Sequence, residues 1–151
     1  MKVKIDIDEK HKGTSITITT DEWTEELQAL VQQIQAEKHQ RIFGIDGDQT
    51  IVLQPEEIDF LYVENRKVYA ALAKKRLEVR MKLFELEQIL HVHHFMRFSK
   101  SVLGNINNIQ RFELSFSGNL CVYFMSGNKE YVSRKYVTNI KERLTMGGNK
   151  I

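Results

Sequence analysis

The sequence predicts a mainly β fold with small helices, α+β overall, in which a β-sandwich is preceded by a β-hairpin and a helix. Two features of the 151-residue chain support this fold class. Short apolar or alternating runs recur at close spacing between turn residues, as the strands of a sandwich do. A few other stretches carry apolar residues at helical spacing instead. With 42% hydrophobic residues the chain can bury a substantial core.

Residues 1–41 are expected to form an N-terminal dimerisation segment. Apolar residues alternate with charged residues and threonines, which predicts a hairpin over residues 2–19 with a turn at Gly13. Thr20 or Asp21 is expected to cap the helix that follows and runs to about Lys38.

The predicted helix carries an apolar stripe from Leu27 to Ile34 at i, i+3, i+4 and i+7 spacing. Such a stripe packs either on the core of its own chain or on a partner. We interpret it as a dimer contact, and intramolecular packing stays open as the alternative.

Residues 42–146 are expected to form a second, larger domain, followed by a tail over residues 147–151. Asp46-Gly47-Asp48 between two apolar runs predicts a hairpin turn, and residues 55–57 can form a one-turn helix. Residues 95–101 are interpreted as a loop region. The predicted strands are 41–45, 50–53, 58–64, 68–73, 76–79, 108–116, 120–125 and 130–132, and 68–73 is expected to pair with 76–79 across Lys74-Lys75. The predicted helices are 82–90 and 134–144, the last capped by Ser133 and ended by Gly147-Gly148.

Charge is divided unevenly between the two parts of the chain. Residues 1–64 hold 6 lysines and arginines against 14 acidic residues, a net charge of −8. Residues 65–151 hold 16 against 6, a net of +10, which returns the total of +2. A basic part of this strength suits a polyanion, although the same residues could simply coat a solvated surface.

The motifs of enzymes and cofactor sites are missing from the sequence. It contains no glycine-rich nucleotide loop, no G-x-S-x-G, no H-E-x-x-H and no C-x-x-C. We therefore predict no enzymatic activity, no cofactor and no metal. His91, His93 and His94 could form a metal site of an enzyme, but solvent-facing histidines at a helix end explain them more simply.

The expected location is the cytoplasm. The single cysteine, Cys121, cannot form an internal disulfide and lies in an apolar run, which is typical of a core thiol. The N-terminus has no signal-peptide pattern, and no apolar run is long enough to enter a membrane.

Three basic clusters coincide with predicted loops or element ends. They are residues 65–67, residues 97–101 and residues 133–136. Each combines a cation with a hydroxyl or amide, which suits phosphate oxygens, and arginine can also read the edge of guanine. In the alternative interpretation, Arg97 and Arg134 only pair with acidic neighbours or with carbonyls.

One of these clusters resembles the core motif of the LytTR family of bacterial DNA-binding domains. The motif is the run from Phe95 to Ser101 together with Asn105 and Ile109. The resemblance covers roughly residues 42–145, in order and spacing. Further matching segments are Ile58–Glu64, Leu83-x-x-Leu86-Glu87-x-x-Leu90 and Val132–Tyr136.

This resemblance implies an elongated arrangement of β-sheets that inserts loops into successive DNA grooves. Arg97 and Asn105 belong to the motif and either contact DNA or hold the loop. Two positions depart from the family pattern: Ser99-Lys100 stands where many members have His-Arg or His-Asn, and Gly104 replaces a branched apolar residue, which predicts a looser loop. The implied DNA-binding residues are Arg66, Lys67, Arg97, Ser99, Lys100, Ser101, Arg134 and Lys135.

Together these observations predict a cytoplasmic, sequence-specific transcriptional regulator that binds double-stranded promoter DNA. It would lack a phosphoacceptor receiver, take no small-molecule substrate, and act as a homodimer on repeated half-sites. The alternative is a protein-interaction module whose basic face docks an acidic partner. The direction of the three basic loops distinguishes the two hypotheses.

Overall fold

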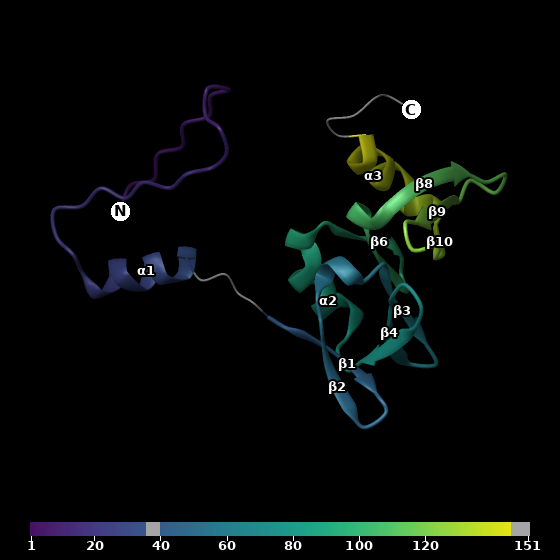
Figure 1. Ribbon diagram of the computed structural model, residues 1–151. Helices are drawn as coiled ribbons and strands as arrows, with labels where there is room; N and C mark the ends of the chain where they lie inside the picture. Colours follow the sequence, from purple (N-terminus) through teal and green to yellow (C-terminus); the bar gives the residue numbers. More distant parts are fainter. Residues whose placement is uncertain (36–39, 146–151) are drawn as a thin grey trace. The chain divides into compact units, whose positions relative to one another are not determined.

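The computed structural model describes residues 1–35 and 40–145 (Figure 1). The chain divides into two units, Met1–His39 and Gln40–Ile151, and each is described by itself. The expected tail, residues 147–151, lies outside the described residues, as do Lys38 and the Gly147-Gly148 pair expected to end the last helix.

The first unit contains one helix and no strand among its described residues. The hairpin predicted over residues 2–19 is therefore wrong. Its chain turns where the amide of His11 donates to the carbonyl of Asp8, but no ladder follows, and Val3, Ile5 and Ile18 stay exposed. An isolated two-stranded hairpin is marginal in water because it has no third strand or helix to cover its apolar face.

Helix α1 spans Glu25–Gln35 and begins later than predicted. Thr24, and not Thr20 or Asp21, is its cap, since the Thr24 hydroxyl accepts from the amide of Leu27 at 3.1 Å. Glu25 and Glu26 occupy the first turn, where the helix dipole favours negative charge.

The second unit is built around a seven-stranded antiparallel sheet with the order β2-β1-β5-β4-β3-β7-β6. The mainly β fold class is thus confirmed. The hairpin turn at Gly47 and the pairing of β4 with β5 across Lys74-Lys75 are as predicted. The strands are β1 Ile42–Asp46, β2 Gln49–Leu53, β3 Phe60–Glu64, β4 Lys67–Ala71, β5 Arg76–Val79, β6 Phe95–Ser99 and β7 Val102–Asn105.

A second sheet has three antiparallel strands in the order β10-β9-β8. Helix α3 packs on β6 of the larger sheet. The remaining elements are β8 Ile109–Leu114, β9 Leu120–Phe124, β10 Lys129–Val132, the helices α2 Leu83–Leu90 and α3 Arg134–Thr145, and the 3-10 turns η1 Pro55–Glu57, η2 His91–His93 and η3 Ile106–Asn108.

The seven-stranded sheet has a hydrophobic core on each face. On one face α2 buries Leu83, Leu86 and Leu90 against alternate side chains of the central strands. On the other face Phe60 and Phe98 pack with residues of the three-stranded sheet and α3. Covering both faces fixes the strand register, because a slip of one residue would exchange the two cores.

Residues 95–105 form a hairpin where the sequence predicted a loop. All four residues of β7 are buried, since this strand is covered on both faces and therefore shows no polar alternation. Strand β6 has a register shift between Arg97 and Ser99, which interrupts its alternation as well. The usual pattern of a half-buried strand is thus absent from both.

Among the described residues, no helix is long and apolar enough to cross a membrane.

Candidate nucleic-acid interface

Strands β3 and β4 are joined by a tight turn that carries the first basic cluster. Glu64 pairs with Lys67, so only Asn65 and Arg66 form the turn, with φ angles of 51° and 65°. Two residues with positive φ are the signature of the type I′ turn that matches the twist of a hairpin. Arg66 is consequently exposed at the tip of the turn, and Lys67 opens the next strand.

Strands β6 and β7 are joined by a second tight turn that carries the second cluster. Ser99 pairs with Val102, which leaves Lys100 and Ser101 at the tip. The Ser99 hydroxyl accepts from the amide of Ser101 at 3.2 Å and lies 3.4 Å from the Ser101 hydroxyl. Lys100 is exposed.

These two turns lie at the same end of the large sheet. Strand β3 pairs with both β4 and β7, and Tyr62 is opposite Val102. The amide of Val63 donates to the carbonyl of Ser101 at 3.0 Å, so the β6–β7 turn is bonded to the strand that leads into the β3–β4 turn.

A β-bulge brings the third cluster to the same place. The register shift between Arg97 and Ser99 leaves Phe98 outside the ladder, and its carbonyl accepts from the amide of Ser133 at 2.9 Å and from the Ser133 hydroxyl at 3.3 Å. Ser133, predicted to cap the last helix, directly precedes α3, and its hydroxyl bond to Phe98 anchors the start of the helix to β6. Arg134 and Lys135 follow directly in the chain.

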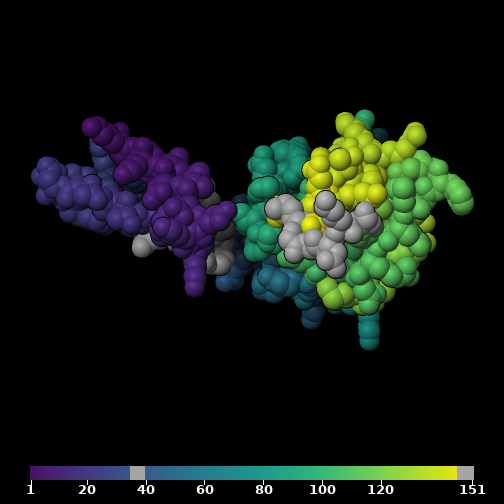
Figure 2. All heavy atoms as spheres, turned by 90° about the horizontal axis from the view of Figure 1, so that it is seen from above, coloured from purple at the N-terminus to yellow at the C-terminus, as the bar shows by residue number. Residues whose placement is uncertain are grey.

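We call these three segments, residues 65–67, 99–101 and 133–135, the basic edge. Arg134 also contacts the β8–β9 turn, since a Cβ built on Gly118 would lie 2.5 Å from the Arg134 Cδ. Figure 2 shows the same neighbourhood from above, with the green residues of β8 and β9 beside the yellow residues of α3. The basic edge therefore extends to the tip of the smaller sheet.

The cations of the basic edge differ in how they are paired. Within the described part of the chain, Arg66, Lys100 and Arg134 form no ion pair, whereas Lys67 lies 4.0 Å from Glu78. Unpaired exposed cations remain available to phosphates, and their field at the surface is not cancelled locally.

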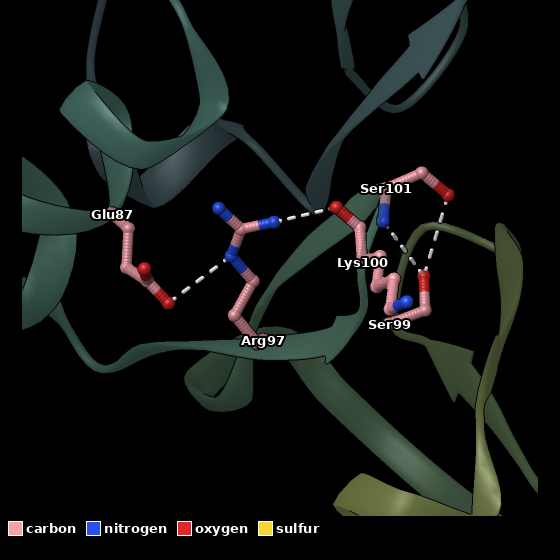
Figure 3. A network of polar contacts seen from close by, with 5 residues as sticks. All are labelled: Glu87, Arg97, Ser99, Lys100 and Ser101. Carbon is pink, nitrogen blue, oxygen red and sulfur yellow. Dashed lines mark hydrogen bonds and ion pairs between the residues drawn. The ribbon is translucent and has the colours of Figure 1, made fainter.

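Arg97 has its hydrogen bonds inside the protein. Its Nε donates to Glu87 of α2 at 3.1 Å and its Nη1 donates to the carbonyl of Lys100 at 2.7 Å (Figure 3). Only 20% of its side chain is exposed. The structure therefore separates Arg97 from the other cations that the sequence grouped with it.

Arg80 is a further cation at this end that was not recognised in the sequence. It follows β5 directly, and the β4–β5 register places it opposite Lys67. The predicted pairing of residues 68–73 with 76–79 would have brought Arg80 to this end of the sheet, because Arg80 follows the second of these strands directly.

Arg76, in contrast, is held on the sheet surface. Hydrogen bonds to Tyr62 and to Glu64 raise the pKa of its guanidinium, which also lies 4.2 Å from the ring centre of Tyr69. Arg76 thereby links β5 to β3, the strand that leads into the β3–β4 turn.

Two motif positions have structural roles. Asn105 is 2% exposed, donates to the carbonyl of Ile58 at 3.0 Å and accepts from the amide of Asn107 at 3.1 Å, so it ties the end of β7 to the start of β3. Gly104 does not loosen the hairpin as expected. The ring of Phe98 fills the space above it, with Cζ 2.1 Å from the place of a Cβ, and any side chain there would displace Phe98.

The histidine cluster is spread over the end of α2 and the following turn. His91 and His93 are exposed in η2, and His94 contacts Arg143 of α3. Within residues 1–35 and 40–145, no group of three or more metal-binding side chains comes together. Cys121 is buried in β9, as a core thiol would be.

Two antiparallel sheets whose turns collect unpaired cations define a β-rich domain suited to bind a polyanion. The chain belongs to the family of LytTr DNA-binding domains, whose model matches residues 48–145. The resemblance drawn from the sequence motif is confirmed. This family is defined by DNA binding and is not a class of enzymes.

Relatives resemble the chain over nearly its whole length. An uncharacterized HTH-type transcriptional regulator of Staphylococcus aureus strain MSSA476 is 26% identical over 147 residues, which cover 97% of this chain and 99% of the relative. The corresponding protein of strain COL is 25% identical over the same shares. Despite that name, the three α-helices in the described residues here are separated by strands, without a helix-turn-helix pair.

A LytTr DNA-binding domain from Bacillus cereus has the same fold. The two structures align with a TM-score of 0.64 at 19% identity, over 70% of this chain and 96% of the other.

Proposed function

We propose that this protein is a cytoplasmic transcriptional regulator that recognises specific promoter sequences through its basic edge. One observation carries the proposal: two hydrogen bonds, from Val63 to Ser101 and from Ser133 to Phe98, join the three basic segments side by side. Cations scattered over the surface would favour docking to an acidic protein instead. A row of adjacent turns suits the phosphate backbones and grooves of a duplex.

The residues of the basic edge divide into two kinds of contact. Lys67, Lys100 and Lys135 are point charges that suit phosphates and give a salt-dependent affinity. Arg66 and Arg134 have the planar fork that pairs with guanine O6 and N7, so we assign them to base edges. Ser99 and Ser101 add hydroxyl donors next to Lys100.

We further propose that the first unit makes the protein a homodimer. Eight large apolar side chains among the described residues of this unit are at least 40% exposed, including Ile7 at 92% and Trp23 at 65%. A segment of this size cannot by itself bury enough apolar surface to be stable, and oligomerisation is one common remedy. Two copies would present two basic edges to half-sites separated by about 10 bp or a multiple of it.

DNA recognition is tested by fluorescence anisotropy with the protein's own promoter DNA and a scrambled duplex, each at two salt concentrations. Tighter binding to the promoter, with affinity falling steeply as salt rises, is the expected result. Equal binding to both duplexes would reduce the proposal to a non-specific basic surface. Absence of binding at low salt would favour the protein-interaction module.

Dimerisation is tested separately by light scattering on the full chain and on two helix variants. Leu30→Asp, on the apolar stripe, is expected to yield monomers. Gln32→Asp adds the same charge to an exposed position of the same helix and is expected to leave the dimer intact. A monomeric wild-type protein at micromolar concentration would contradict the proposal.

A further inference from the structure

The β6–β7 turn receives support from helix α2 through a single arginine. Figure 3 shows the Arg97 side chain between the Glu87 carboxylate on one side and the backbone of the turn on the other. Nε donates to the carboxylate and Nη1 donates to the carbonyl of Lys100. Arg97 thereby connects the helix to the residue at the tip of the turn.

Both ends of this connection are fixed. Leu86 and Leu90 flank Glu87 on the helix and are fully buried, so α2 cannot rotate without opening the core. Phe95 and Phe98 flank Arg97 at 2% and 0% exposure. The Lys100 carbonyl is therefore linked through Arg97 to a helix that the core holds in place.

Stability does not explain the arrangement well. The Glu87 side chain is 41% exposed, and ion pairs that open to solvent contribute little to folding. The guanidinium does something that lysine cannot, because its planar donors point in fixed directions and can serve a carboxylate and a carbonyl at once. The Arg97–Glu87 pair therefore fixes the conformation of the β6–β7 turn more than it adds to the free energy of folding.

We infer that Arg97 is a positioning residue for DNA recognition: together with Glu87 it sets the conformation in which the β6–β7 turn presents Ser99, Lys100 and Ser101. This inference rests on the proposed function. It replaces the direct DNA contact by Arg97 that its place in the basic cluster suggested.

The two possible roles of Arg97 predict opposite effects of the Glu87→Gln substitution on DNA affinity. If Arg97 contacted a phosphate, Glu87 would compete for it, and Glu87→Gln would free the arginine and tighten DNA binding. If Arg97 positions the turn, Glu87→Gln loosens it and weakens binding to the promoter. Arg97→Lys separates the roles again, because it keeps the charge that a phosphate needs and loses the fork that the turn needs.

The experiment measures promoter and scrambled-duplex affinities of the full chain by anisotropy, after thermal melting has established that each variant is folded. Both variants leave Lys100 in place, so scrambled-duplex affinity should stay near the wild-type value. A displaced turn changes the register in which Arg66 and Arg134 reach base edges, so Arg97→Lys and Glu87→Gln are each expected to lower the promoter preference roughly tenfold. A general loss of folding would instead lower both affinities together. Glu142→Gln removes an exposed acid elsewhere on the second unit and controls for the change in net charge.

Arg97→Lys with wild-type promoter affinity would overturn the inference. So would Glu87→Gln with affinity equal to or tighter than that of the wild type and of the Glu142→Gln control. If the wild-type protein itself showed no promoter preference, the proposed function would fail before Arg97 was tested, so the two failures are distinguishable.

Discussion

The two ends of the seven-stranded sheet carry opposite chemistry on the same scaffold. At one end the turns present cations, of which Arg66 and Lys100 form no ion pair within the described residues. At the other end, which we call the acidic end, polar groups are bonded to one another. Its charged residues are Asp46, Asp48, Glu56, Glu57, Asp59, Lys74 and Lys75.

Asp59 shows how the acidic end uses its polar groups. This carboxylate is 4% exposed and accepts from the side chains of Asn108 at 3.1 Å, Ser126 at 2.5 Å and Asn128 at 2.9 Å. Asn128 also donates to the carbonyl of Leu72. The network joins the two sheets, so this end holds the domain together while the basic edge is left with unpaired charge.

The largest effect is expected at the acidic end and on stability alone. Asp59→Ala removes the carboxylate that three side-chain donors share in a buried site and should lower the free energy of unfolding by about 3 kcal/mol. Denaturant melts measure this loss, and Asp48→Ala in the exposed β1–β2 turn is the control with little effect. Promoter affinity of the folded variant should equal that of the wild type. A selective loss of promoter affinity would show that the two ends are not independent.

The next largest effect concerns the start of α3. Arg134→Ala should cost about 1–3 kcal/mol of binding at the promoter and relax the sequence preference, because a bidentate contact to a base would be lost. Anisotropy against single-base variants of the promoter measures this relaxation. If the variant lost affinity equally for promoter and scrambled DNA, Arg134 would be a backbone contact.

A smaller effect separates the two lysine-bearing turns. Lys100→Ala should weaken binding to all duplexes by a similar factor and reduce the slope of log affinity against log salt by about 1. Lys74→Ala removes the same charge from the β4–β5 turn at the acidic end and should leave the slope unchanged. Equal slopes for the two variants would mean that net charge, and not the position of the basic edge, governs affinity.

Much of the larger unit could be predicted from the sequence, since local patterns decided it. Turn or helix chemistry specifies single elements: Asp46-Gly47-Asp48 the β1–β2 hairpin, Pro55 the turn η1, and the leucine spacing the helix α2. The β6–β7 hairpin could not be found in this way, because β7 is buried on both faces and a bulge interrupts β6. The N-terminal hairpin failed for the converse reason: its alternation is clear, but no other element of the unit covers it.

The candidate site was predictable as a set of residues and not as an arrangement. Basic residues at predicted loops identified the three segments, whereas their adjacency depends on Val63 and on the carbonyl that the bulge at Phe98 releases. The partner of Arg97 is ten residues away, on a helix whose orientation is set by the core. Charge pattern alone therefore could not distinguish a cation that contacts DNA from one that holds a turn.

The smallest expected effect on stability is at the tip of the β3–β4 turn, where conformation and charge can be separated. Arg66 has a φ of 65°, which glycine adopts without steric cost but which disfavours other residues. In Arg66→Gly, relief of this strain and the greater freedom of the unfolded chain nearly cancel, so the free energy of unfolding should change by no more than about 0.5 kcal/mol. Promoter affinity should nevertheless fall severalfold, because the turn keeps its shape and loses its cation.

Arg66→Lys, which keeps the charge in the same strained backbone, should retain non-specific affinity and lose base preference. If Arg66→Gly bound the promoter as tightly as the wild type, the basic edge would begin at Lys67, and recognition would depend on the β6–β7 turn and α3 alone.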